Sequence, residues 1–277
     1  MQQQFFGHPE FPLFGVYHPP RGGNKNTRAV VICPPVGQEF NRSHWALRML
    51  ATQLARKGVH VFRFDYHGVG DSAGNTDQIE SLDSWTRNIG QAVEHLKKLS
   101  GVRNVMLIGL RLGGLLAAKT AIRSSDVNSI ILWEPVVNGG QYLNDLRSMH
   151  AQMLDLWVCK MQTPNNENIE EILGSRYQRS LLTEIEQQAF DVGQVLQPQL
   201  ILQSPTDTES FSHPEPSLQK VVQTDRDGAW NDLRELETAC SGPKRPTRSQ
   251  QRPSICFTAL SDSVYQVHSL CQEPCNA

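Results

Sequence analysis

The segment Gly109-Leu110-Arg111-Leu112-Gly113 holds one charged side chain between two glycines, after a predicted strand and before a predicted helix. A tight strand–turn–helix connection of this kind leaves little space for side chains two positions before and two positions after its central residue. The central side chain projects from the end of the strand, where an acyl-transfer reaction can place its nucleophile. Arg111 cannot fill that role, because its guanidinium stays protonated at pH 7 and carries no nucleophilic lone pair.

The elements around this turn alternate between short β-branched runs and amphipathic stretches. The patterns predict strands at 28–33, 59–64, 104–108, 129–133, 199–202 and 220–223, and helices at 43–57, 85–99 and 115–122. Such alternation is typical of an α/β protein with a mostly parallel sheet and helices on both faces. Ligands of these sheets bind at the carboxyl ends of the strands, and Arg111 lies at one such end.

Two further loops follow predicted strands at the same edge of the sheet. One is Cys33-Pro34-Pro35-Val36-Gly37-Gln38-Glu39, and the other is Asp65-Tyr66-His67-Gly68-Val69-Gly70-Asp71-Ser72. The loop from Asp65 to Ser72 is similar to the D-x-R-G-x-G-x-S loop of α/β-hydrolases, with His67 in place of the arginine. With the elbow at Arg111, the chain resembles the serine aminopeptidase-like α/β-hydrolases over about residues 12–239. Gly-Leu-Arg-Leu-Gly and the segment 34–58 are most similar to bacterial exosortase A system-associated hydrolase 2-type proteins, which also carry arginine at the elbow.

The resemblance implies an α/β-hydrolase fold and cleavage of an ester, amide or acyl-thioester bond in a pocket between the sheet and a cap. The oxyanion donors would then be backbone N–H groups near Val36, Gly37 and Leu112. The resemblance also assigns places in the chain to the other members of a catalytic triad.

A triad needs a histidine base and an acid that orients it. The acid falls after the strand at 199–202, where Asp207 is the candidate, and the base falls after the last predicted strand. Residues 224–230 contain no histidine, so His213, between the two strands, and His268, near the C-terminus, are the remaining candidate bases. Two of the three triad roles are therefore unfilled at the places that the resemblance assigns.

Arg111 would lie at the base of the cleft, where it would hold an anion or form a buried ion pair. A buried guanidinium without a carboxylate is costly, so at least one acidic side chain should lie within pairing distance. The candidates at the ends of the predicted strands are Glu39, Asp65, Glu134 and Asp207. Asp65 and Glu134 are therefore included among the expected pocket residues.

Two other side chains are candidate nucleophiles. Gly70-Asp71-Ser72-Ala73-Gly74 resembles the nucleophile segment of chymotrypsin-like proteases, but it follows a parallel strand of an α/β chain, so we interpret Ser72 as a turn or helix-cap serine. Cys33 ends a buried strand, where a free cysteine is usually an inert small hydrophobe. A Cys33–His67 pair stays open as a minor alternative.

After residue 138 the pattern changes. Residues 139–196 show helical periodicity and no predicted strand, with helices expected at 142–161, 169–173 and 180–190. An insertion of this kind indicates a helical cap (139–197) over the carboxyl ends of the strands. It would divide the hydrolase core into a first part (1–138) and a second part (198–239).

The last 38 residues, 240–277, differ from the body in composition. They contain four of the six cysteines and show no sustained periodicity, and a helix that begins near residue 228 stops in the middle of its pattern. We interpret them as a disordered tail or as the product of a frameshift. A zinc or disulfide cluster is disfavoured, because no C-x-x-C pair occurs.

The composition narrows the class of protein. With 39% hydrophobic residues, 19% charged residues and a net charge of -2, the chain of 277 residues is neither a disordered polyelectrolyte nor a general nucleic-acid binder. Apolar runs reach about eight residues, far below the roughly 20 that span a bilayer. Neither a targeting segment nor a metal or nucleotide motif is visible, which predicts a cytoplasmic protein without a cofactor.

Two hypotheses on function remain open. The chain is a hydrolase without the standard Ser-His-Asp triad, or it is a non-catalytic protein of the same fold. In the second case the Arg111 pocket binds a small acyl or carboxylate ligand or a protein partner. The sequence indicates no oligomeric state.

Overall fold

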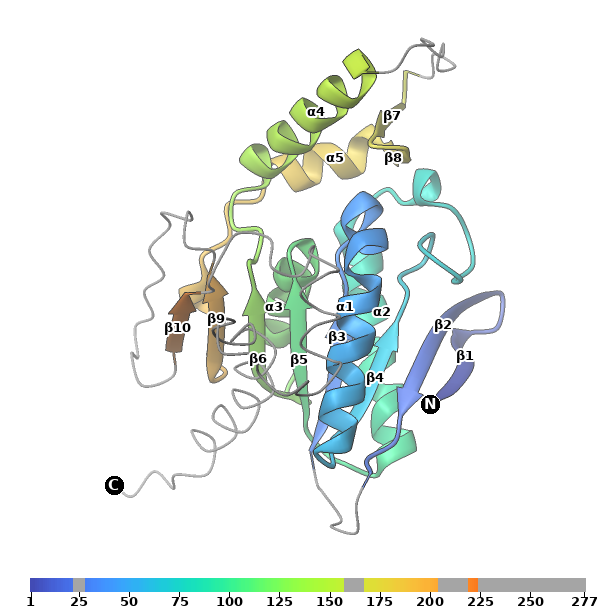
Figure 1. Ribbon diagram of the computed structural model, residues 1–277, viewed down its shortest axis with the longest axis vertical. Coiled ribbons are helices and arrows are strands. Elements are labelled where there is room, and N and C mark those ends of the chain that lie inside the picture. Colours follow the sequence, from blue (N-terminus) through green and yellow to red (C-terminus); the bar gives the residue numbers. More distant parts are fainter. Residues whose placement is uncertain (22–27, 157–166, 204–218, 224–277) are drawn as a thin grey trace, which may run out of the picture.

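The computed structural model describes residues 1–21, 28–156, 167–203 and 219–223. Its main feature is an eight-stranded sheet with the strand order β1-β2-β4-β3-β5-β6-β9-β10 (Figure 1). The strands are β1 (Gln2–His8), β2 (Phe11–His18), β3 (Ala29–Cys33), β4 (His60–Phe64), β5 (Val105–Leu110), β6 (Val127–Trp133), β9 (Gln199–Gln203) and β10 (Gln219–Gln223). The pairs β1–β2 and β2–β4 are antiparallel and the other pairs are parallel. The predicted mostly parallel sheet is confirmed.

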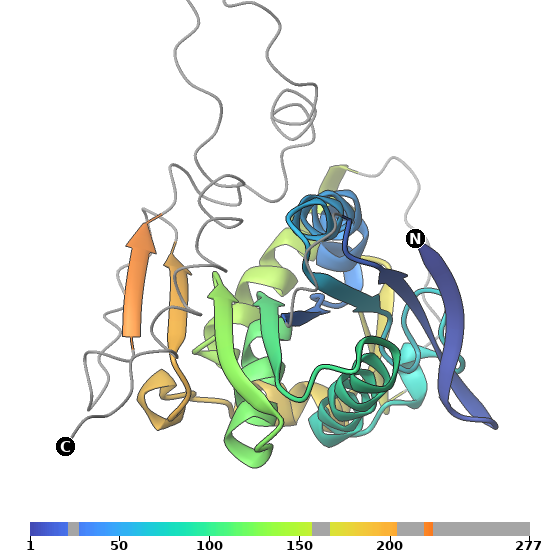
Figure 2. The ribbon, with the colours of Figure 1, turned by 90° about the horizontal axis from the view of Figure 1, so that it is seen from below.

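Helices cover both faces of this sheet (Figure 2). They are α1 (Gly37–Arg56), α2 (Leu82–Ser100) and α3 (Leu112–Arg123). The apolar residues of α1 pack with one face of the sheet, whereas α2 and α3 pack with the other. Two separate apolar layers therefore hold the central strands, as the buried sequence runs predict.

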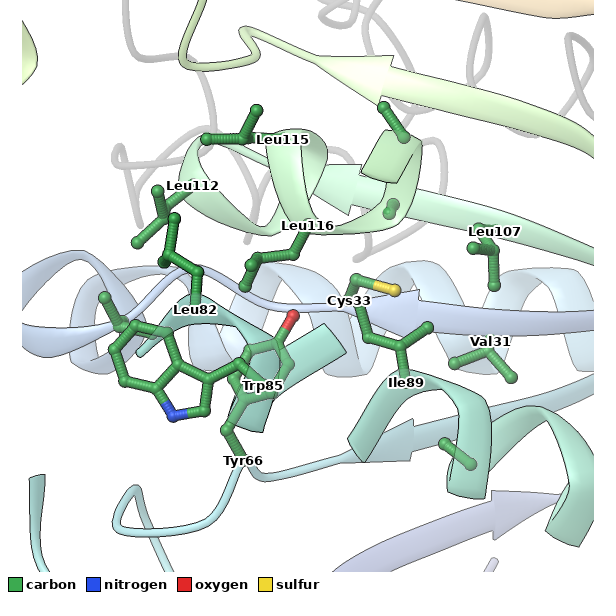
Figure 3. Close-up of a cluster of buried hydrophobic side chains, with 14 of the residues drawn as sticks. Val31, Cys33, Tyr66, Leu82, Trp85, Ile89, Leu107, Leu112, Leu115 and Leu116 are labelled. Carbon is green, nitrogen blue, oxygen red and sulfur yellow. The ribbon is translucent and has the colours of Figure 1, made fainter. Parts of the chain in front are cut away.

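Figure 3 shows the layer under α2 and α3, where Tyr66, Trp85, Ile89 and Leu116 surround Cys33. Cys33 is completely buried in this layer. Burial disfavours the thiolate and raises the pKa of the Cys33 thiol. The side chain is a core residue, which agrees with its interpretation as an inert hydrophobe.

Two elements of the core differ from the sequence prediction. Helix α1 begins at Gly37, six residues before the expected start at Ser43, and Val36 is its N-cap residue in an extended conformation. The hairpin β1–β2 was not predicted, since Gly7, Pro12 and Gly15 interrupt the apolar pattern. Gly15 lies against β4: a Cβ there would be 2.3 Å from the ring of Phe62.

Above the carboxyl ends of the strands lies the cap (Figure 1). It contains α4 (Gly139–Leu156), β7 (Ile169–Ile172), β8 (Ser175–Gln178) and α5 (Arg179–Glu186). Hydrogen bonds tie it to the core, among them one from the amide N of Leu82 to Oε2 of Glu184 at 2.9 Å and one from Nε2 of Gln178 to the carbonyl of Asp77 at 2.6 Å.

The prediction of a purely helical cap is wrong at residues 169–173, because Ile169–Ile172 form β7 of an antiparallel hairpin and Leu173 lies in its turn. Ile169 and Ile172 are three apart, a spacing that also fits a helix, but Leu173 and Gly174 have φ angles of 50° and 80°. Two consecutive positive φ values form a tight hairpin turn. The expected helix at 180–190 is the shorter α5, and residues 157–161 of the expected first cap helix lie outside the described residues.

The remaining predictions concern the boundaries between the hydrolase core, the cap and the tail. The division of the chain at residues 138, 197 and 239 stays a prediction. The helix expected from residue 228 and the tail at 240–277 lie outside the described residues. In the part that the structure describes, no helix is both long and apolar enough to cross a membrane.

Candidate functional site

Arg111 lies in the turn between β5 and α3, as the sequence predicts, with φ 53° and ψ −122°. A non-glycine residue in such a conformation costs about 1–3 kcal/mol, so its surroundings must hold it there. The amide of Arg111 donates to the carbonyl of Trp133 at 3.0 Å, and the Arg111 carbonyl accepts from the amide of Gly114 at 2.9 Å. The neighbouring strand β6 and the first turn of α3 therefore fix the elbow.

The two glycines that flank the elbow are sterically required. A Cβ at Gly109 would lie 2.5 Å from the carbonyl oxygen of Gly113. A Cβ at Gly113 would lie 2.3 Å from the carbonyl oxygens of both Cys33 and Pro34. The clashes involve backbone atoms, which cannot rotate away, so the turn tolerates only glycine at these places whatever side chain stands at 111.

The guanidinium of Arg111 forms the predicted ion pair, and its partner is Glu39 on α1. Nε of Arg111 lies 3.0 Å from Oε1 of Glu39, and Nη1 donates to the carbonyl oxygen of Glu134 at 3.3 Å. The other carboxylate oxygen of Glu39 accepts from the hydroxyl of Tyr142 on α4 at 2.9 Å. The ring of Tyr142 lies against the guanidinium, with 5.6 Å between the ring centroid and Cζ. We call these three side chains the elbow cluster: Glu39, Arg111 and Tyr142.

The electrostatics fix the protonation of this cluster. Burial alone would lower the pKa of Arg111, but Glu39, Tyr142 and Glu134 together outweigh it, and the pKa of Arg111 lies above its ordinary value. Burial and then the charge of Glu39 raise the pKa of Tyr142 far above its ordinary value. Arg111 is therefore a cation and Tyr142 a neutral hydrogen-bond donor at any physiological pH.

A second cap tyrosine lies beside the expected oxyanion donors. Val36 and Gly37 are at the N-terminus of α1 and Leu112 is the first residue of α3, so their amides belong to the helix turns whose N–H groups lack intrahelical acceptors. A Cβ at Gly37 would lie 2.1 Å from the hydroxyl of Tyr177 on β8. Burial raises the pKa of Tyr177 to about 12. The cap thus places a neutral hydroxyl directly over the start of α1.

Asp65, an expected pocket residue, does not pair with Arg111. Its Oδ2 accepts from the amide of Asp71 at 3.0 Å, within its own loop. Asp65 is 8% exposed, and burial raises its pKa to about 6. It lines a cavity of about 10 Å³ together with Arg63 and His44, which is about the space that one buried water needs.

The other two nucleophile candidates have structural roles in this geometry. The hydroxyl of Ser72 donates to the carbonyl of Asp65 at 2.6 Å and accepts from the amide of Phe14 at 2.8 Å, so the turn interpretation of Ser72 is confirmed. The ring of His67 lies edge-on to Phe11, at 5.6 Å between centroids. Because Cys33 is a buried thiol with a raised pKa, a Cys33–His67 nucleophile is not supported.

The remaining triad candidates, Asp207, His213 and His268, lie outside the described residues. Within the described ranges, no group of three His, Cys, Asp or Glu side chains could hold a metal ion. Sequence analysis missed Tyr142 and Tyr177 as site residues. Tyr142 is 103 residues from Glu39, and no local pattern signals a contact over that separation.

The topology of the sheet, the helices on both faces and the strained elbow after β5 define the α/β-hydrolase fold. Within that class, the sequence matches the family described as serine aminopeptidase, S33, over residues 25–211. This is more than half of the chain, and the chain belongs to that family. The comparison with curated proteins finds no match.

Solved structures agree with this fold. Est1E from Butyrivibrio proteoclasticus, with ferulic acid bound, superposes with a TM-score of 0.62 at 15% identity, over 96% of this chain and 99% of that one. A proline iminopeptidase from Mycobacterium smegmatis gives 0.61 at 12% identity, over 98% and 100%. DcsB in complex with a substrate analogue gives 0.61 at 14% identity, over 98% and 99%. At these identities the likeness establishes the fold alone.

Proposed function

We propose that this hydrolase-like protein binds a small carboxylate or acyl ligand without covalent catalysis, at Arg111 between the sheet and the cap. The observation that carries the proposal is the ion pair between Arg111 and Glu39 on the elbow. A guanidinium cannot attack a carbonyl, and here a carboxylate keeps it charged. The elbow thus presents a fixed cation where relatives of this fold hold a nucleophile.

The ligand class follows from the donors that remain. Among the described residues, Arg111 bonds through Nε and Nη1, so Nη2 is the nitrogen left to a ligand oxygen. The side chain is 27% exposed, which is enough for contact with a ligand. The amides of Gly37 and Leu112 would add neutral donors beside it. One cation with flanking N–H groups suits a carboxylate or the carbonyl of an acyl group.

The hydrolytic alternative also has a specific observation in its favour. The elbow keeps its strained φ of 53° and both required glycines, which are the features that present a nucleophile in active relatives of the fold. In that case Asp207 and His213 would supply the acid and base, water would attack, and the product would come from an ester, amide or acyl-thioester. Membership of the exosortase A system-associated hydrolase 2 subgroup is likewise proposed, on Gly-Leu-Arg-Leu-Gly, and the cytoplasmic location stays a prediction.

Two assays separate these functions. We expect no covalent labelling by a fluorophosphonate probe and no turnover of p-nitrophenyl esters beyond that of an Arg111→Gln control. Labelling of a serine, or turnover that Arg111→Gln abolishes, would overturn the non-catalytic proposal. An active relative of the family serves as the positive control for both reagents.

Binding is tested directly with carboxylate probes. Benzoate and octanoate are titrated by ligand-observed NMR, with benzyl alcohol and octanol as uncharged probes of similar size. We expect Arg111→Gln to weaken carboxylate binding about tenfold, the value of one charge-assisted hydrogen bond. Arg123→Gln removes an exposed arginine that pairs with Asp83 and should leave binding unchanged. Equal binding of acids and alcohols would contradict the role of Arg111.

A further inference from the structure

A second group of charged side chains lies on the face of the sheet that α1 covers. Figure 1 shows α1 over β3 and β4, with β2 beside it. His18 on β2 is opposite Val61 on β4, and Val61 packs with the apolar residues of α1. Opposite residues of an antiparallel pair point to the same face, and so do residues two apart on one strand. His18 and Arg63 therefore lie on the face of the sheet next to α1.

Arg63 is a partly buried cation without an ion pair among the described residues. Its Nε donates to Nε2 of His18 at 3.4 Å, whereas Asp65, two residues further on the same face, accepts from the amide of Asp71. Burial lowers the pKa of Arg63 to about 10. The two terminal nitrogens of Arg63 have no acceptor in the described ranges and are not enclosed, so they are open to solvent. In the elbow cluster, by contrast, a carboxylate of the chain pairs with the buried guanidinium.

Two more arginines lie near this guanidinium. On α1, His44 and Arg48 are four residues apart and share one side of the helix, and His44 lines the small cavity that Arg63 also lines. The amide of Arg21 donates to a carbonyl in the last turn of α1 at 2.7 Å. Burial and then nearby cations, the three arginines among them, lower the pKa of His18 to about 4. We call these four side chains the basic cluster: His18, Arg21, Arg48 and Arg63.

The sequence shows the same imbalance of charge. Residues 11–64 contain eight lysines and arginines and one acidic residue, Glu39, although the whole chain has a net charge of -2. Glu39 belongs to the elbow cluster, where it pairs with Arg111. The three arginines of the basic cluster form no ion pair in the part of the chain that the structure describes. Cations gathered in this way repel each other and attract an anion from solution.

We propose that the basic cluster binds a phosphate group, through Arg48 and Arg63, between α1 and β2. A guanidinium presents its N–H groups as a fork that fits two oxygens of a phosphate. Two guanidiniums suit an anion with more than one negative charge, and a phosphate monoester carries about 1.5 to 2 at pH 7. Neutral His18 holds Arg63 through Nε and leaves its terminal nitrogens to the ligand. The proposal is independent of ligand binding at Arg111, because it uses no residue of the elbow cluster.

A soluble phosphate compound and a lipid headgroup share this chemistry, and two measurements on the full chain separate them. The first is calorimetric titration with inorganic phosphate in about 0.15 M sodium chloride, which screens long-range attraction. We expect saturable binding with a dissociation constant of about 1 mM or below. The second is cosedimentation with phosphatidylcholine vesicles, with and without phosphatidic acid. Binding only to vesicles with phosphatidic acid would assign the site to a headgroup, and no binding in either measurement would overturn the proposal.

Two exposed arginines of α1 locate the site. Arg48→Gln should weaken binding at least about tenfold in whichever measurement detects it, a loss of about 1.4 kcal/mol. Arg42→Gln is the matched control, because Arg42 is also exposed but lies about 120° around the helix axis from Arg48. It should leave binding nearly unchanged. Equal weakening by both variants would indicate general attraction to a positive surface and would overturn the proposal, as would binding unchanged in Arg48→Gln.

A third variant tests the fork of Arg63. Arg63→Lys keeps the positive charge but removes the paired N–H groups, so it should also weaken binding. Circular dichroism checks that all three variants fold. Binding unchanged in a folded Arg63→Lys would contradict the role of this guanidinium.

Discussion

Among the described residues, two arginine–glutamate clusters lie in different surroundings. In the elbow cluster, Arg111 and Glu39 are 27% and 12% exposed, and Tyr142 of the cap covers them. In the cap, Arg147 pairs with Glu170 at 2.7 Å and with Glu186 at 3.3 Å, and Arg147 and Glu186 are 34% and 47% exposed. The first joins the core to the cap, whereas the second joins parts of the cap to each other.

The comparison indicates that the surroundings of an ion pair, more than the identity of its two partners, decide how much it contributes to stability. When Arg147 is removed, Glu170 keeps its pair with Arg179 at 3.2 Å and water solvates the exposed Glu186, so that cluster contributes little to stability. At the elbow, Arg111 and Glu39 each stabilise the other's charge, because removal of one leaves the second mostly buried without an opposite charge. We therefore expect substitutions in the two clusters to have unequal effects.

The largest effect is expected from Glu39→Ala. It leaves Arg111 without its carboxylate and should lower the free energy of unfolding by about 3 kcal/mol. Urea denaturation measures the loss. The double variant Glu39→Ala with Arg111→Leu should recover part of it, because no unpaired charge is left. A double variant as unstable as the single one would show that the charge is not the cause.

The next effect concerns Asp65, a buried carboxylate that has no ion pair among the described residues. Its pKa is raised to about 6, so the native state favours its neutral form. The resulting stability is present at low pH and is lost as the pH rises through about 6, by about 2–3 kcal/mol between pH 4 and pH 7. Asp65→Asn should remove this difference.

Unfolding measured at several pH values, in the wild type and in Asp65→Asn, isolates that contribution. The two curves should converge at the acidic end and separate towards neutral pH, with the variant more stable there. Parallel curves would contradict a raised pKa of Asp65.

Tyr142→Phe should have a smaller effect. It removes the hydroxyl that donates to Glu39 but keeps the ring over Arg111, at a cost of about 1.5 kcal/mol for a hydrogen bond to a charged group. Tyr66→Phe is the matched control, because the buried Tyr66 hydroxyl has no hydrogen-bond partner among the described residues. Thermal unfolding of both variants compares them, and an equal loss would argue against the Glu39 contact.

The smallest effect is expected in the cap. Arg147→Gln should lower stability by less than about 1 kcal/mol, and high salt should reduce even that difference. Chemical denaturation at low and high salt provides the measurement. A loss comparable to that of Glu39→Ala would remove the distinction between the two clusters.

Sequence analysis predicted the central sheet, the elbow and an acidic partner for Arg111. These follow from local rules: buried strands alternate with helices, and the ends of neighbouring parallel strands meet at one edge. Glu39 was one of four candidates for the pair, and spacing alone could not choose among them. Tyr142 and Tyr177 could not be predicted, because their position depends on how the cap packs on the core.

The hairpins were missed for a related reason. Strand β1 is neutral and mostly exposed, so it has no alternating pattern, and β7 is too short to be distinguished from a helical turn. Their strand character depends on pairing with a neighbour rather than on their own residues.

The clashes around Gly109 and Gly113 have a consequence for how such a site can change over time. The shape of the elbow is imposed by its flanking backbone, and the residue at 111 plays no part in those contacts. Evolution could therefore exchange a nucleophile for a cation at this position without rebuilding the fold, and could reverse the exchange by a single substitution. The same backbone turn can therefore present either a nucleophile or a cation at position 111.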